Sequence, residues 1–402
     1  MSANLYVIYL CVIIIISFMF TKLAQRTNIP SVLMLIILGF GFKEFMEIKG
    51  ILYDFSNTLE VLGIIGLIMI VLEAALDLEL RREKWAVIRN SFLVAFLSLL
   101  VSVPLVALII QTFFQHIGWL PSLIYAVPFS IMSSAIVIPS IVNLSKYKKE
   151  FMIYESTFSD ILGIMLFYFL IENVDNGSFG EVLFSLSVNL IITVIVSLVF
   201  SYLLILIMEK VRSNTRFFLF LSILVLIYSV SKIFHLSSLL IILVFGLMLR
   251  NHRTLPLGKR LKKYFEGEEI DRLFGNFKMI TEETSFVVRT FFFIIFGITI
   301  SLETLVRPKV WLLSLSFMVV LFLVRYFLFL CVEKKNIFPQ VFLAPRGLIS
   351  ILLFFGIPDN FKVPEFEEGA LLLIILFTCL MMAASLIIMR NKKDISDSEN
   401  TL

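Results

Sequence analysis

An apolar stretch, residues 151–167, carries four polar side chains near its middle: Glu155, Ser156, Ser159 and Asp160. On a helix, Ser156, Ser159 and Asp160 share one face, whereas Glu155 lies about 140° around the axis from Asp160. An acid held inside a bilayer costs roughly 2.5–3.5 kcal/mol on insertion scales, so its presence indicates function. Burial favours the neutral form of a carboxyl group, so a proton can compete there with a cation near neutral pH. These residues predict a monovalent-cation site at Asp160; a purely structural acid is the alternative.

A second polar group lies between two prolines in residues 119–144, where Ser133 and Ser134 stand between Pro128 and Pro139. Proline removes a backbone donor and frees nearby carbonyl groups. Irregular backbone at membrane depth is tolerated only where protein or a cavity lines it. Carbonyl and serine oxygens are hard ligands that suit an alkali cation, so we expect Ser133 and Ser134 to complete the site. The alternative is an ordinary proline kink packed by small residues.

Several other charges fall inside apolar runs. Arg325 must pair or reach a cavity, and Glu155 is its natural partner, so we expect a structural ion pair. Arg346 could neutralise helix ends where broken helices cross, or it could snorkel to the interface. Glu73 is a candidate accessory residue, unless it lies near the cytoplasmic end of its helix. We expect an interfacial position for Arg289.

The composition predicts an all-α polytopic membrane protein. The chain of 402 residues is 59% hydrophobic and 16% charged, against about 25% charged in ordinary globular domains. Apolar runs of about 20 residues recur throughout, whereas a β-barrel would show short alternating segments. The net charge of +4 is spread between these runs and indicates no nucleic-acid partner. The three cysteines and three histidines form no metal or disulfide pattern, and we expect no cofactor.

The apolar runs predict about thirteen transmembrane helices, the first of which is read as a span and not as a signal peptide. Lys and Arg concentrate after odd-numbered spans, which places the N-terminus outside and the C-terminus in the cytoplasm. The connection 251–283 is predicted to be an amphipathic surface helix. The predicted spans are about 4–23, 29–47, 57–79, 86–113, 119–144, 151–172, 181–208, 216–233, 236–250, 284–304, 309–332, 338–357 and 368–389.

An internal repeat relates the two halves of the chain. The pattern I-I-L-x-F-G at 36–41 recurs at 241–246, and the proline-broken fifth span corresponds to the twelfth. An offset of seven spans inverts the second unit, which predicts two inverted six-helix repeats with broken crossing helices. We expect one transporter domain over 1–402. Its parts are repeat one at about 4–172, a linking helix at about 181–208, repeat two at about 216–389 and a short cytoplasmic tail at 390–402.

These motifs resemble those of monovalent cation:proton antiporters in the sodium/proton exchanger branch, the NhaP- and NapA-like proteins. The resemblance covers spans two to thirteen in order. It implies a homodimer in which a core domain moves against a static dimerisation domain. It also gives Asp160 the ion-binding role, and Glu155 and Arg325 the role of a buried stabilising pair. The matching segments are Glu155-Ser156-x-x-Ser159-Asp160 for E-S-x-x-N-D, residues 224–251, Phe291-Phe292-Phe293 through Gly297, and Pro345 to Ser350 for R-G-A-I-S.

The chain departs from the family pattern at two places. Ser159 replaces an Asn or Asp, and Ser133-Ser134 replaces a Thr-Asp. The single remaining carboxylate favours electroneutral exchange of one cation for one proton across a cell (inner) membrane, in a role in pH homeostasis. Na⁺ is the favoured ion, with K⁺ or Li⁺ open at Asp160. Alternatives are a K⁺/H⁺ antiporter or potassium-efflux relative, an exchanger that has lost transport and, remotely, a polytopic membrane transferase; we expect no enzyme.

Overall fold

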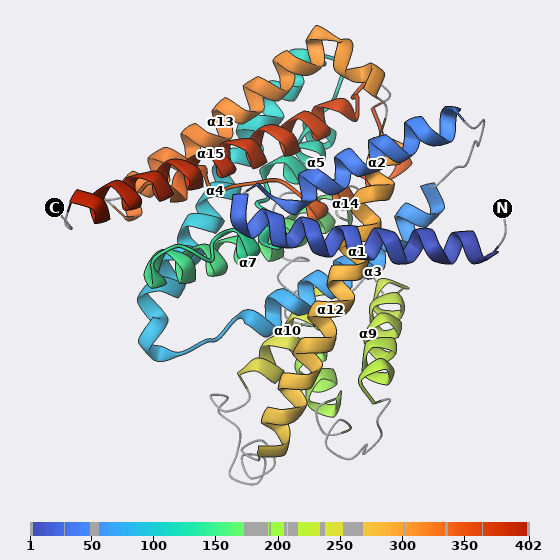
Figure 1. Cartoon of the computed structure of the whole chain (residues 1–402), viewed down its shortest axis with the longest axis vertical. Coiled ribbons are helices and arrows are strands. Elements are labelled where there is room, and N and C mark those ends of the chain that lie inside the picture. The colour runs from blue at the N-terminus through green and yellow to red at the C-terminus, as the bar shows by residue number, and fades with distance from the viewer. Residues whose placement is uncertain are drawn as a thin grey trace.

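The computed structural model describes residues 3–27, 29–48, 56–172, 192, 194–204, 207, 216–233, 238–251, 268–300, 302–333, 337–363 and 365–399. Regular structure in these ranges is helical throughout, without a strand (Figure 1). Twelve of the thirteen predicted spans coincide with described helices or with a broken pair of them. Of the seventh, Val194–Leu204 is described as helix, and most of its remainder lies outside the described residues.

The predicted all-helical membrane fold is confirmed. By length and composition alone, six helical segments in the described ranges could each cross a membrane. The helices are α1 (Ala3–Thr27), α2 (Ser31–Ile48), α3 (Ser56–Asp77), η1 (Arg82–Lys84), α4 (Trp85–Phe113), α5 (Trp119–Ser130), α6 (Ser134–Ser140), α7 (Lys146–Glu172), α9 (Arg216–Ile233), α10 (Ser238–Arg250), α12 (Glu268–Thr299), η2 (Leu302–Val306), α13 (Pro308–Val332), η3 (Gln340–Phe342), α14 (Leu348–Phe355), η4 (Asp359–Phe361) and α15 (Gly369–Glu399).

The helices pack in reciprocal pairs. Helix α2 packs against α12, and α10 packs against α3. In the same way α4 packs against α7, and α13 against α15. The members of each pair have counterparts seven spans away, which is the packing expected of two repeats related by a two-fold axis. The residue boundaries of the repeats remain a prediction.

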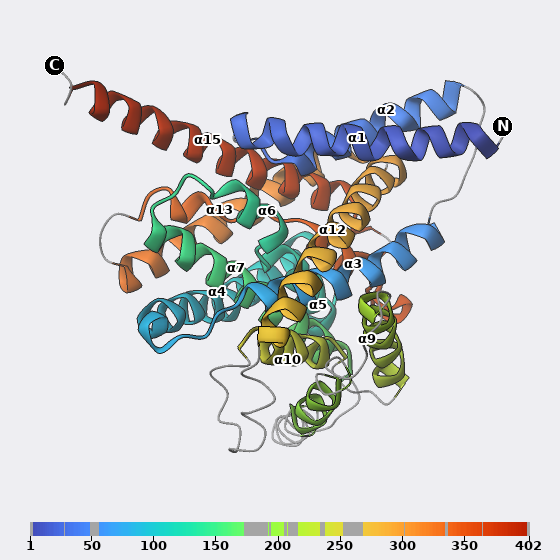
Figure 2. The same cartoon turned by 60° about the horizontal axis from the view of Figure 1, so that its bottom comes forward.

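Two groups of helices result from this packing. Helices α4, α5, α7, α13 and α15 form one group, and α3, α9, α10 and α12 form the other (Figure 1). Helices α1 and α2 run side by side along one edge, near α12 (Figure 2). We refer to the first set, with α6 and α14, as the core group, and to α1, α2, α3, α9, α10 and α12 as the outer group.

Two of the predicted spans are broken, and their breaks touch. Helix α5 ends at Ser130, the next three residues are extended, and α6 begins at Ser134. The other break separates η3 from α14. The backbone N–H of Ser133 donates to the Pro345 carbonyl at 2.9 Å, joining one break to the other. The crossing of broken helices is therefore present, and it lies in the core group.

The prediction for the connection 251–283 was wrong in part. Residues 268–283 are not a separate surface helix, because α12 runs without interruption over Glu268–Thr299. Phe277 is fully buried and contacts the rings of Phe217 and Phe245. Lys278 and Glu282 pair on one face of this helix, whereas Phe277 packs inward, so the polar pattern resembled that of a surface helix. Residues 252–267 lie outside the described part of the chain.

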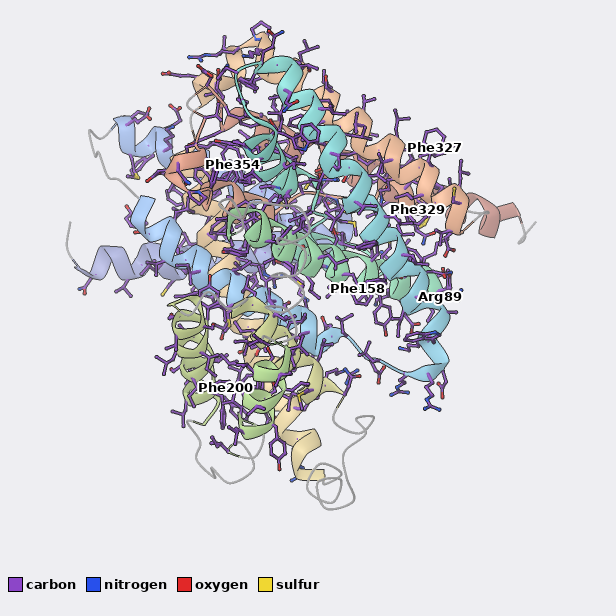
Figure 3. The ribbon with its side chains drawn as sticks, turned by 180° about the vertical axis from the view of Figure 1, so that it is seen from behind. Arg89, Phe158, Phe200, Phe327, Phe329 and Phe354 are labelled. Carbon is purple, nitrogen blue, oxygen red and sulfur yellow. The ribbon has the colours of Figure 1, made fainter. Side chains whose placement is uncertain are left out.

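Large apolar side chains cover the outside of the molecule, as expected of a surface that faces lipid. On α13, Phe327 is 60% exposed, whereas Phe329 is fully buried against the ring of Phe151 from α7. Figure 3 shows Phe327 standing away from the bundle. Helix α13 therefore presents one apolar face outward and packs another against α7.

Candidate ion-binding site

Asp160 lies on α7 beside the break in the fifth span. Its side chain is buried, and its Oδ2 atom accepts a hydrogen bond from the Ser134 backbone N–H at 3.0 Å. That N–H is available because the chain is extended just before α6, so no preceding helical carbonyl accepts it. The other carboxylate oxygen, Oδ1, is buried without a hydrogen-bond partner among the described residues. Asp160 therefore has one oxygen fixed and one oxygen available to a proton or a cation.

Ser159 also contacts the backbone at the break in the fifth span. Its hydroxyl oxygen accepts a hydrogen bond from the Met132 backbone N–H at 3.0 Å. One turn further along α7, Gly163 faces Ile131 so closely that an added Cβ would overlap the isoleucine side chain. The absence of a side chain at Gly163 lets α7 approach the break, as the sequence predicted. Helix α7 thus positions the acid and holds the irregular backbone in place.

The remaining serines differ in position. Ser133 is buried, its hydroxyl has no hydrogen-bond partner among the described residues, and Gly347 from the second break lies against it. Ser134 contributes its backbone N–H. The Ser156 hydroxyl donates to the Ile153 carbonyl at 3.2 Å, so it is engaged with its own helix. The structure brings Ser133, Ser134 and Ser159 to Asp160 and leaves Ser156 bonded elsewhere.

Glu155 and Arg325 form a buried, bidentate ion pair. The Arg325 Nη2 atom donates to Glu155 Oε2 at 3.0 Å, and Nη1 donates to Oε1. The same guanidinium donates through Nε to the Val341 carbonyl at 3.0 Å and through Nη2 to the Gln340 carbonyl at 3.0 Å. Arg325 therefore joins α13, α7 and the short helix η3. The sequence suggested the acid partner, but it held no signal for the carbonyl contacts.

Arg346 lies inside the crossing and not at the membrane interface. It is only 4% exposed, and its Nε atom donates to the Phe129 carbonyl at 2.8 Å, at the end of α5. Its Nη1 atom donates to the Ala344 carbonyl at 2.6 Å, and its backbone N–H donates to the Thr378 hydroxyl at 3.0 Å. A cation near the last carbonyls of a helix stabilises that end. Thr378 escaped prediction because a threonine in an apolar helix carries no distinguishing pattern.

A cavity of about 140 Å³ lies beside Ser134. Glu73 and Arg289 face each other there, with Arg289 Nη2 3.4 Å from Glu73 Oε1. Arg289, for which we expected an interfacial position, lines this cavity. The lining residues are Ile70, Glu73, Ala74, Ser134, Ala135, Ile138, Pro139 and Arg289.

Broken helices that cross beside a buried, partly unpartnered acid define a class of protein, the secondary membrane transporters. Comparison with known proteins narrows the class. The chain belongs to the family of transmembrane sodium/hydrogen exchangers, whose model matches residues 12–390. The family predicted from the sequence motifs is thereby confirmed.

Solved structures share the fold. The sodium proton antiporter MjNhaP1 from Methanocaldococcus jannaschii at pH 8 superposes with a TM-score of 0.69 at 18% identity, covering 96% of this chain and 99% of that one. An electron-microscopy map of the same antiporter gives a TM-score of 0.67 at 18% identity, with coverages of 96% and 95%. No curated protein matches the sequence. At this identity the likeness establishes the fold alone.

Proposed function

We propose that the protein exchanges sodium for protons across a cell membrane, with Asp160 as the residue that binds either ion. The observation that carries the proposal is the setting of this carboxylate. It is buried at the break, with Oδ2 held by the Ser134 N–H and Oδ1 without a partner in the described residues. A carboxylate removed from water is unstable as a free charge, so it takes up a proton or a cation before the core moves. Family membership supports the same exchange.

The proposal extends to the whole molecule. The protein is a transporter and not an enzyme. It spans the membrane with its N-terminus outside and its C-terminus in the cytoplasm, and it works as a homodimer. The core group carries Asp160 past the outer group during transport. Glu155 and Arg325 hold the core together, and Ser133, Ser134 and Ser159 line the ion path, with Ser156 and Glu73 in accessory roles.

The proposal is tested by reconstituting the protein in vesicles that contain a pH-sensitive dye. After a pH gradient is imposed, addition of sodium should dissipate it, and omission of the cation should not. If none of the tested cations dissipates the gradient in the wild type, the protein is an exchanger in fold only, and the proposal fails.

Asp160→Asn tests the residue. Because an amide neither titrates nor carries the negative charge that balances a bound cation, exchange should fall to the level of protein-free vesicles while the protein remains folded. Asp359→Asn is a matched control, because Asp359 is exposed at the start of η4 and, in the described part of the chain, its side chain forms a salt bridge with Lys362. Coupled exchange retained by Asp160→Asn would remove this residue from the site.

A potassium/proton antiporter is the second candidate. The observation in its favour is the hydroxyl group at Ser159 and at Ser134, where the family pattern has larger amide or carboxyl groups. Smaller ligands leave a wider space around Asp160, which suits the larger ion. A series of sodium, potassium and lithium on the same vesicles decides between the candidates: the ion with the lowest half-saturating concentration is the substrate.

A further inference from the structure

The cavity beside Ser134 contains a charge pair, Glu73 and Arg289, of which the proposed mechanism uses only Glu73, and that in an accessory role. Its walls come from both groups of helices: Glu73 on α3 and Arg289 on α12 belong to the outer group, and Ser134 on α6 belongs to the core group. Ser134 is also the residue whose N–H holds Asp160. The cavity therefore reaches the backbone that binds the acid, and an ion approaching from this side passes Glu73 and Arg289.

The charged residues that line this cavity sum to no net charge. Among the described lining residues, Glu73 and Arg289 are the charged ones, and their side chains are about equally exposed, at 20% and 21%. Glu73 is nevertheless not saturated by this contact, because its Oε2 atom is buried without a hydrogen-bond partner in the described residues. Only Oε1 contacts the guanidinium, at 3.4 Å. Glu73 thus keeps one buried carboxylate oxygen that the guanidinium does not contact.

We infer that Arg289 determines cation affinity: it is a tethered counter-cation that neutralises Glu73 and so limits the attraction of the cavity for the transported ion. The inference rests on the proposed function of Asp160. A cavity lined by one sign of charge concentrates counter-ions, and low-dielectric walls strengthen the effect. With Arg289 present the wall carries no net charge; without it, Glu73 would draw cations toward Ser134. An arginine suits this role because its guanidinium stays charged at any physiological pH.

The inference makes opposite predictions for the two members of the pair. Arg289→Gln leaves Glu73 unneutralised, so the half-saturating sodium concentration should fall by about fivefold. Glu73→Gln leaves a bare positive charge, so this concentration should rise by a similar factor. The double variant restores a neutral wall and should return to within about twofold of the wild type. Arg289→Lys keeps the charge and should resemble the wild type.

The experiment is the vesicle assay with sodium as the probe, reading the half-saturating concentration and the maximal rate separately. Lys278→Gln is the matched control. Lys278 on α12 pairs with Asp77 on α3, so it joins the same two helices, but it does not line the cavity. The control should leave the half-saturating concentration unchanged.

A merely structural Arg289 would give a different pattern. Shifts in the same direction for both single variants, or a loss confined to the maximal rate, would overturn the inference. If Arg289→Gln does not fold, the test moves to the Glu73→Gln background, where removing Arg289 must lower the half-saturating concentration, and no change there overturns it. Failure of the wild type to exchange any cation would instead refute the proposed function, so the two failures are distinguishable.

Discussion

The core group holds two buried acids that differ in how completely they are bonded. Glu155 has both carboxylate oxygens engaged by Arg325. Asp160 has one oxygen bonded to a backbone N–H and no positively charged side chain in contact among the described residues. A fully paired acid is a poor ion ligand, because a new cation would have to displace the guanidinium. This difference in bonding supports the proposed structural part of Glu155 and the proposed ion binding at Asp160.

Breaking the Glu155–Arg325 pair should unfold the core. Glu155→Gln or Arg325→Gln each strands a charge in a buried setting, which costs about 3–5 kcal/mol. The double variant Glu155→Gln/Arg325→Gln removes both charges and should lose less than the sum of the single variants. The measurement is thermal unfolding of the detergent-solubilised protein.

An exposed pair provides the control for this experiment. Lys362 and Asp359 form a salt bridge in a loop with side chains 54% and 93% exposed. Solvent screens such a pair, so Lys362→Gln should leave the unfolding temperature unchanged. Equal effects of Lys362→Gln and Arg325→Gln would contradict the stabilising role of the buried pair.

At the scale of elements, the closest helix contact in the outer group depends on glycine. Helices α2 and α12 meet where Gly39 faces Gly297, and a Cβ on Gly39 would overlap the Ile294 carbonyl oxygen. Backbone cannot move aside as a flexible side chain can, so the helices would have to separate. Small residues that permit close backbone approach are the usual means of packing helices in membranes.

Gly39→Ala should therefore destabilise the protein by about 1–3 kcal/mol, the usual effect of overpacking. Gly41→Ala is a matched control two residues away on the same helix, because nothing lies within 4 Å of the Cβ it would add. Unfolding temperatures of the two variants, compared with the wild type, give the result. A loss at position 41 equal to that at position 39 would contradict the packing argument.

The elements were largely predictable because each one extends over about twenty apolar residues, and the break in the fifth span was marked by its prolines. The exact position of that break was not. Pro128 and Pro139 lie inside α5 and α6, and the extended residues fall between them, where α7 and Arg346 supply the missing hydrogen bonds. Such partners come from distant parts of the chain, so local pattern cannot reveal them.

The side-chain partners in the candidate site were likewise predictable only in part. Glu155 and Arg325 could be paired in advance because a buried charge needs an opposite charge. The neighbours of Arg346 and the meeting of Glu73 with Arg289 could not, because a carbonyl or a cavity leaves no mark on composition. The two repeats also differ in one detail: Gly246 packs on Ala75, whereas the equivalent Gly41 has open space around it.

At the scale of the whole molecule, the two helix groups are joined by a short connection between α3 and α4. The Asn251 side chain of the outer group donates to the Leu78 carbonyl at 2.9 Å and accepts from the Leu80 N–H at 2.7 Å. Between these contacts, the Tyr154 hydroxyl of the core group donates to the Glu79 carbonyl at 2.6 Å. Hydrogen bonds from both helix groups hold this connection. Any motion of one group relative to the other would therefore strain or rearrange these bonds.

The charge carried by the core group decides whether its motion responds to voltage. Glu155, Arg325 and Arg346 are buried in the core group, so under the proposed mechanism they would move with it and contribute the same charge in both directions of transport. In that mechanism Asp160 is the residue that changes its occupant, and a proton and a monovalent cation carry equal charge. The loaded core thus has the same charge whichever ion it carries.

Exchange by the wild type should therefore be insensitive to an imposed membrane potential. Moving one elementary charge through 100 mV is worth about 2.3 kcal/mol, so an electrogenic cycle would respond strongly over that range. Ser159→Asp supplies the contrast, because it adds a second carboxylate beside Asp160 that can still accept the Met132 N–H. That variant should acquire voltage dependence, measured as sodium-driven proton flux in vesicles clamped at opposite potentials. A voltage-dependent wild type would mean that a second titrating group travels with the core.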